Sequence, residues 1–122
     1  MKIVLDTNFL IDLVRFKVDL TEIESFVHEP YALATSGKVV AELKSLSKGN
    51  SKTSAYAKLA LKLIDELHIQ VIKSKQASAD KEIIELAKES ITATNDKELR
   101  KKLKSFGKKT IYLKSKKHLA IG

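Results

Sequence analysis

Residues 2–8 read KIVLDTN, a short apolar run that ends in an acid and two polar residues. A continuous apolar run of this kind is typical of a strand that is buried on both faces of a sheet. Residues 91–96 read ITATND, so Asp96 closes this second run as Asp6 closes the first. A helical pattern follows each acid. Functional sites of open α/β sheets lie beyond the carboxyl ends of the strands, so we expect the two carboxylates to lie side by side.

The rest of the chain alternates between strand-like and helix-like segments. Strands are expected over residues 3–5, 31–34, 69–72, 91–94 and 110–113. Helices are expected over residues 9–16, 20–27, 39–46, 54–67, 79–88 and 97–106, the second of them with Thr21 and Glu24 as a capping box. Strands that alternate with helices imply a parallel sheet covered on both faces. The sequence therefore predicts one three-layer α/β/α domain over residues 1–117, with a central parallel sheet of about five strands and a short tail at 118–122.

Composition excludes several classes of protein. One proline and four glycines leave little room for a long flexible linker. The absence of cysteine rules out a disulfide framework and a thiolate metal site. No apolar run approaches the length of a membrane span, and an acid at position 6 is too early for a signal peptide. We expect a soluble cytoplasmic protein without a membrane partner.

The net charge of +8 is concentrated in the last quarter of the chain. Residues 1–90 hold equal numbers of acidic and basic side chains, whereas residues 91–122 hold ten Lys or Arg against Asp96 and Glu98. Such asymmetry favours a polyanionic partner, and nucleic acid is the first candidate. A solvated lysine-rich surface is the alternative.

Two further acids can join the pair at the strand ends. Asp80 falls in the first turn of an expected helix, and Glu42 lies three residues from Val39, which places it beside the buried side of its helix. Each acid alone has a structural explanation. Asp6 and Asp96 would be helix caps, Asp80 would complement a helix dipole, and Glu42 would be an exposed helix residue. Clustered carboxylates repel one another, and a hard divalent cation removes that repulsion. One or two such ions would support in-line attack of water on a phosphodiester.

These residues carry a resemblance to a known family. LDTN at residues 5–8, VVAEL at 39–43 and TNDKEL at 94–99 look like the motifs of a PIN domain, and TIYL at 110–113 fits the last strand of that family. The likeness runs from Met1 to about Lys117, and the motifs are specific jointly rather than separately. It is closest to small archaeal-type PIN proteins similar to ribosomal-RNA processing nucleases, and is shared more loosely with VapC-type toxins. The resemblance implies an α/β/α fold and Mg²⁺- or Mn²⁺-dependent cleavage of single-stranded RNA.

The resemblance also assigns roles to individual side chains. The acids that would bind metal and carry catalysis are Asp6, Glu42, Asp80 and Asp96. Residues that would support them are Thr7, Asn8, Thr94 and Glu98. Cations expected to contact RNA recur at helical spacing immediately after Asp96; they are Lys97, Arg100, Lys101 and Lys104. The implied partners are single-stranded RNA such as a ribosomal-RNA precursor, a second copy of the chain in a homodimer and, for a VapC-type toxin, an antitoxin.

The match departs from the family pattern at Asp80. Many PIN domains have the third acid followed by a small residue and then an apolar one, whereas residues 80–84 read DKEII. Strict register would put Lys81 in the acidic position, and an offset of one residue rotates a helical side chain by about 100°. Glu82 is then the substitute acid.

Two rival functions remain open. A PIN fold with weakened metal affinity would act as an RNA-binding assembly factor through its basic end, and the offset at Asp80 favours that interpretation. A phosphatase or phosphoacceptor domain that starts from Asp6 would usually need another Asp beside it, which Thr7 and Asn8 do not provide. A glycine-rich phosphate loop is absent from the sequence.

Overall fold

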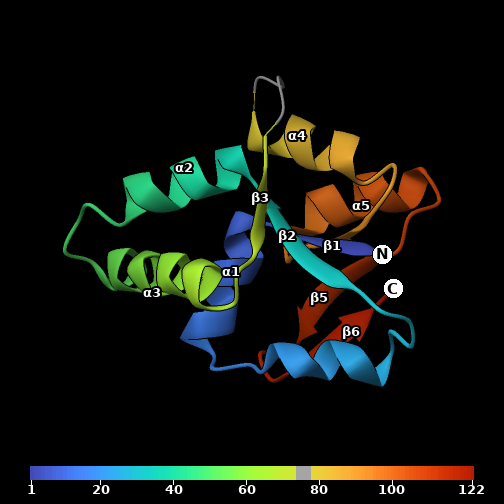
Figure 1. Cartoon of the computed structure of the whole chain (residues 1–122), viewed down its shortest axis with the longest axis horizontal. Helices are drawn as coiled ribbons and strands as arrows, with labels where there is room; N and C mark the ends of the chain where they lie inside the picture. The colour runs from blue at the N-terminus through green and yellow to red at the C-terminus, as the bar shows by residue number, and fades with distance from the viewer. Residues whose placement is uncertain (74–77) are drawn as a thin grey trace.

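The structure, a computed structural model, describes residues 1–73 and 78–122, with the backbone alone for Ala79 and Asp80. The strands of the described chain are β1 (Lys2–Leu5), β2 (Ala32–Ser36), β3 (Gln70–Ile72), β4 (Ile91–Ala93), β5 (Thr110–Lys114) and β6 (His118–Ile121). They form one sheet in the spatial order β3-β2-β1-β4-β5-β6 (Figure 1). Strands β1 to β5 are parallel, and β6 runs antiparallel to β5.

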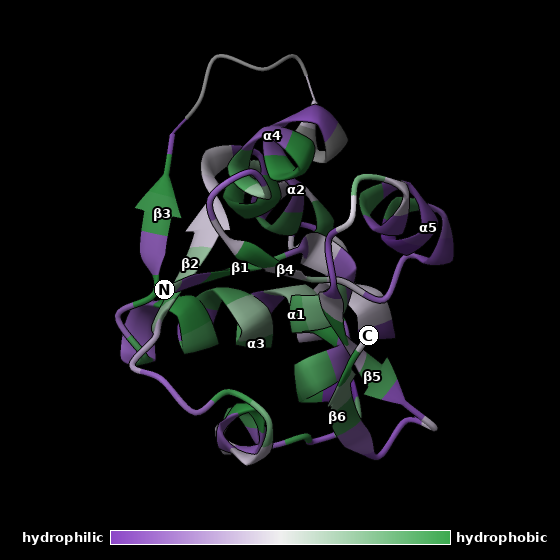
Figure 2. Cartoon of the chain, turned by 90° about the vertical axis from the view of Figure 1, so that its right-hand side faces the viewer, coloured by the Kyte–Doolittle hydropathy of each residue, from purple (hydrophilic) through white to green (hydrophobic). Residues whose placement is uncertain are grey.

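Helices cover both faces of this sheet. They are α1 (Thr7–Arg15), α2 (Gly37–Leu46), α3 (Lys52–Glu66), α4 (Ala79–Leu86) and α5 (Lys97–Ser105), with a 3-10 helix η1 (Leu20–Ser25). Figure 2 shows α2, α4 and α5 on one side of the sheet and α1 and α3 on the other. The predicted three-layer α/β/α architecture is confirmed. Among the described residues, none of the helices combines the length and the apolar character that crossing a membrane requires.

Strand β1 lies in the middle of the core. Ile3, Val4 and Leu5 are fully buried, because the strand is flanked by β2 and β4 and covered on both faces by helices. Burial on both faces explains why residues 3–5 form a continuous apolar run. The helix that follows β1 buries Phe9 and Leu10 beside it. Asp6, the first residue of the candidate site, therefore directly follows the most buried strand of the fold.

Two local predictions were wrong. Residues 118–121, expected to be part of a tail, form β6, which pairs with β5 from Ile111↔Ile121 to Lys114↔His118. The helix expected over residues 20–27 is a shorter 3-10 helix. Its cap is not the expected Thr21 side chain but the Asp19 carboxylate, which accepts from the Thr21 amide at 2.9 Å. This backbone hydrogen bond lowers the pKa of Asp19.

Candidate functional site

The topology of the sheet places the candidate site between β1 and β4. The chain leaves β1 into α1 on one face of the sheet, and leaves β4 into α5 on the other face (Figure 2). The strand order reverses at this pair, since β2 and β3 lie to one side of β1 and β5 and β6 lie beyond β4. A crevice opens at such a switch point, outside the carboxyl ends of the strands. Asp6 and Asp96 follow these two strands, so the crevice lies between them.

Asp6 is a buried carboxylate, only 5% exposed. Its Oδ1 accepts from the amide of Thr7 at 2.8 Å, which caps α1. Its Oδ2 accepts from the Thr94 hydroxyl at 2.8 Å and from Asn8 Nδ2 at 3.3 Å. Hydrogen bonds of this kind favour the charged form of a carboxyl group. Helix capping accounts for the hydrogen bond of Oδ1. It does not account for the two side chains that donate to Oδ2.

Asp96 caps the other helix at the crevice. Its Oδ1 accepts from the amides of Glu98 and Leu99 at 3.0 and 3.3 Å, so the structural explanation for this acid also holds. Its Oδ2 accepts no hydrogen bond from the described residues. The side chain of Asp96 is half-buried.

Thr94 connects the two acids. Its hydroxyl donates to Asp6 Oδ2 and accepts from the amide of Asp96 at 3.2 Å, and the side chain is fully buried. Asn8 reinforces this link, because its Oδ1 accepts from the amide of Asn95 at 2.9 Å. The structure therefore brings Asp6 and Asp96 together through one hydroxyl, with Asn8 and Thr94 in the supporting positions.

Asn95 contributes a contact that the sequence pattern did not indicate. Its Nδ2 donates to Asp12 Oδ2 at 2.9 Å, and its Oδ1 accepts from the amide of Leu113 at 2.7 Å. One side chain thus ties α1 to the end of β5 beneath the crevice. Its place between Thr94 and Asp96 in the motif was the only sequence signal for this role.

Replacing Thr94 with Val should destabilise the protein by about 1.5–3 kcal/mol, because a hydrogen bond to a buried carboxylate is removed without a change of shape. Equilibrium urea unfolding measures the effect. Thr92 provides a matched control on the same strand, since its buried hydroxyl has no hydrogen-bond partner among the described residues. Thr92→Val should be neutral or stabilising. Equal destabilisation by both substitutions would contradict the link between Thr94 and Asp6.

The remaining acids lie around the start of α2. Strand β2 ends beside β1 with Leu5 opposite Thr35, so α2 begins next to Asp6. Glu82 of α4 is 1% exposed, and its Oε1 accepts from the amide of Lys38 at 3.2 Å in the first turn of α2. Glu42 lies one turn further along α2 and is solvent-exposed. The exposed position of Glu42 favours the alternative of a surface residue of the helix over a place beside its buried side.

The backbone of Asp80 is in the first turn of α4, and its side chain lies outside the described residues. Within the part of the chain that the structure describes, no three acidic or histidine side chains lie close enough together to hold a metal ion. The donor chemistry nevertheless fits a hard cation. Asp96 Oδ2 and the buried hydroxyl of Thr7, the residue after Asp6, are oxygen atoms without a hydrogen-bond partner among the described residues. Oxygen ligands are those that Mg²⁺ and Mn²⁺ prefer.

The cations of α5 fall into two groups. Lys97, Lys101 and Lys104 are exposed. Arg100 is half-buried, with its guanidinium 3.6 Å from the centre of the Tyr112 ring and its Nε 3.2 Å from Thr110 Oγ1. Arg100 therefore fastens α5 to β5, a role that the helical spacing of the cations did not indicate.

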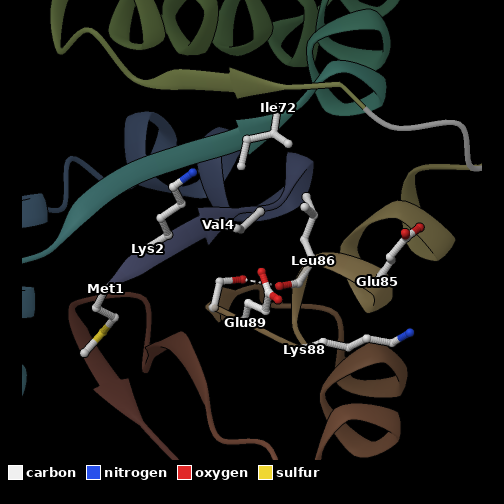
Figure 3. Close-up of a pocket in the computed structure, with 9 residues that line it drawn as sticks. Met1, Lys2, Val4, Ile72, Glu85, Leu86, Lys88 and Glu89 are labelled. Atoms are coloured by element: carbon white, nitrogen blue, oxygen red, sulfur yellow. Dashed lines mark hydrogen bonds between the residues drawn. The ribbon is translucent and has the colours of Figure 1, made fainter.

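A hollow of about 630 Å³ lies on the α4 face of the sheet (Figure 3). Val4, Ile72 and Leu86 contribute apolar surface to it, while Lys2 and Glu89 contribute charges of opposite sign. None of the described residues that line it is among the acids or supporting residues predicted from the sequence. The hollow and the acidic crevice are therefore separate features.

Comparisons with known proteins identify the family of the chain. A family model described as a PIN like domain matches residues 3–116. Ribonuclease VapC4 from Methanocaldococcus jannaschii is 32% identical, over 98% of this chain and 95% of its own length. Ribonuclease VapC9 from Archaeoglobus fulgidus is also 32% identical, over 97% of this chain and 87% of its own length.

Solved structures show the same fold. The structure of the PIN domain endonuclease Utp24 superposes with a TM-score of 0.79 at 20% identity, covering 98% of this chain and 90% of that one. A domain of a functionally unknown protein from Methanocaldococcus jannaschii gives a TM-score of 0.65 at 22% identity, covering 93% and 91%.

Proposed function

The chain belongs to the PIN-like domain family, and on that premise we propose that it is a metal-dependent endoribonuclease that hydrolyses phosphodiester bonds of single-stranded RNA. The observation that carries the proposal is the junction of Asp6 and Asp96 through the Thr94 hydroxyl at the switch point of the sheet. Two relatives over nearly the whole chain are named ribonucleases, which supports RNA as the substrate.

The residues proposed to hold Mg²⁺ or Mn²⁺ are Asp6, Glu42, Asp80 and Asp96, with Glu82 as the substitute for Asp80. When bound, a divalent cation neutralises the carboxylates and the developing charge on the phosphate, and lowers the pKa of water. The hydrogen bonds of Thr94 and Asn8 hold Asp6 Oδ2 in one orientation, and the amides at the start of α5 hold Asp96 Oδ1. These contacts preorganise the two carboxylates before RNA binds.

The exposed cations of α5 follow Asp96 directly and are proposed to contact the phosphates. Lys97, Lys101 and Lys104 fit that role, since they are exposed on the helix that starts at the crevice. Arg100 is a poor choice for a binding test, because its removal would also release α5 from Tyr112 and Thr110.

A panel of end-labelled substrates tests the proposal. Purified protein is incubated with single-stranded RNA, duplex RNA and single-stranded DNA in Mg²⁺, Mn²⁺ or EDTA. We expect cleavage of the single-stranded RNA in either metal and none in EDTA. Binding of RNA without cleavage in any metal would instead support the alternative of a PIN assembly factor without catalysis.

Two biological roles are distinguished by gene neighbourhood. The names of both relatives favour a VapC-type toxin, whose gene should follow a small antitoxin-like reading frame directly. A housekeeping locus without that frame would favour ribosomal-RNA maturation, the role that the sequence resemblance placed first.

The proposal also includes a homodimer. Leu59, Leu67 and Val71 are 50%, 46% and 41% exposed on α3 and β3, which supports an apolar contact between copies.

A further inference from the structure

A second cationic surface lies away from α5, where the end of α1 meets the turn between β5 and β6. The guanidinium of Arg15 lies 4.7 Å from the centre of the Phe16 ring, and the ammonium of Lys116 lies 5.7 Å from it. Lys17 follows the ring directly. Figure 1 shows the β5–β6 turn beside the segment that follows α1. We call Arg15 and Lys116 beside the Phe16 ring, together with the exposed Lys17, the hairpin-end patch.

Three residues in and beside this patch have positive φ angles, which glycine adopts more easily than other residues. Lys17, Ser115 and Lys116 have φ angles of 53°, 56° and 58°. This left-handed region is disfavoured for a residue with a Cβ, and Gly or Asn usually occupies it. Lys17 directly follows Phe16, the C-cap of α1, and the Val18 amide donates to the Leu13 carbonyl at 3.0 Å. Gly is the common residue at the position of Lys17. Glycine at Lys17 or Lys116 would therefore remove a charge without adding backbone strain.

Hydrogen bonds link the elements that carry the patch to the acidic crevice. Asn8 joins the crevice to Asn95, and Asn95 joins α1 at Asp12 to β5 at the amide of Leu113. Strand β5 ends one residue later at Lys114, where the β5–β6 turn begins. Because β5 runs parallel to β4 and β1, this turn lies at the same edge of the sheet as Asp6 and Asp96.

We propose that the hairpin-end patch binds phosphates of the single-stranded RNA that occupies the acidic crevice. This inference rests on the proposed function. An acidic crevice by itself repels a polyanion, so cations beside it are needed to hold the strand. The Phe16 ring attracts both neighbouring cations to its faces and so keeps them at a defined place.

The double variant Lys17→Gly with Lys116→Gly tests the proposal, because it removes two charges and relieves the backbone at the same time. RNA binding is measured by fluorescence anisotropy on a labelled single strand in EDTA, so that cleavage does not interfere. Because the variant cannot make these two phosphate contacts, the slope of log affinity against log salt should become shallower by about 1.4. The dissociation constant should rise about tenfold at low salt, while the melting temperature stays unchanged or increases.

Two control variants separate the explanations. His68 has a φ angle of 51° at the end of α3, so His68→Gly relieves the same kind of strain away from the patch and should leave RNA affinity unchanged. Lys48→Gln with Lys58→Gln removes two exposed charges elsewhere and should alter the salt slope by much less.

Four results would overturn the proposal. The first is an unchanged salt slope in the glycine variant, and the second is an equally weakened affinity in the Lys48 and Lys58 control. The third is a fall in the melting temperature of the glycine variant. The fourth is displacement of the labelled RNA by polyglutamate as effectively as by unlabelled RNA. The last would identify the patch as a surface for an acidic protein segment. Cleavage is assayed separately in Mg²⁺, so a protein that binds RNA through the patch without cutting it would refute the proposed function alone.

Discussion

Asp6→Asn is expected to lower the rate of metal-dependent RNA cleavage by at least about 10³-fold, because it removes the charge that the cation and the reaction need. The free energy of unfolding should stay within about 1 kcal/mol of wild type, since the amide oxygen of Asn still caps α1. Single-turnover cleavage and urea unfolding measure the two quantities on the same preparations. Losing a buried negative charge also relieves repulsion among the acids.

A matched change elsewhere controls for this experiment. Asp65 is an exposed acid on α3, so Asp65→Asn removes the same charge far from the crevice and should leave the rate near that of wild type. Full activity of Asp6→Asn would remove this carboxylate from the mechanism. A large loss of stability would show that Asp6 serves the fold.

Asp96 offers a test that separates capping from catalysis. Asn caps a helix about as well as Asp, whereas Ala loses the hydrogen bonds to the amides of Glu98 and Leu99. Asp96→Ala should therefore cost about 1 kcal/mol more in unfolding free energy than Asp96→Asn. Both variants should lose RNA cleavage by about 10²-fold or more, because both lack the charge. Cleavage that survives in the Asn variant and falls only in the Ala variant would reduce Asp96 to a helix cap.

The strands and most helices were predictable because their signals are local. The apolar run before Asp6 and the runs that end at Thr94 and Leu113 each occupy a strand of the sheet, to within a residue or two. Parallel order followed from the alternation with helices. Strand β6 was missed for a physical reason. Its turn places Ser115 and Lys116 at positive φ without the Gly or Asn that marks such turns in a sequence.

Long-range contacts complete β6. The amide of Leu119 donates to Glu22 Oε1 at 3.0 Å, which ties the strand to η1 across most of the chain. Local sequence patterns cannot indicate a contact between residues as far apart in the chain as Glu22 and Leu119. Likewise, the side-chain oxygen that caps η1 comes from Asp19, two residues before Thr21 of the expected capping box, and only the backbone path decides between the two.

The candidate site was predictable in part. The position of Asp6 and Asp96 after two buried strands was enough to expect them at one edge, and the structure has them at adjacent strands. Helical periodicity gave the face of α2 only to within one residue, which left Glu42 assigned to the buried boundary. The role of Asn95 depends on Asp12 and Leu113, which are far away in sequence. Likewise, Arg100 was predicted to contact RNA because its stacking partner, Tyr112, lies on β5 and could not be identified from the helix pattern.

The chemistry of the cleaved ends tests the central claim most directly. A single-stranded RNA and the same strand with one 2′-deoxy residue at the cut site are compared in Mg²⁺ under single-turnover conditions. Attack by water does not use the 2′-hydroxyl, so we predict that both strands are cut at similar rates and that no 2′,3′-cyclic phosphate forms. Cleavage of the all-ribose strand alone, with cyclic phosphate ends and no effect of EDTA, would contradict hydrolysis at the crevice between β1 and β4.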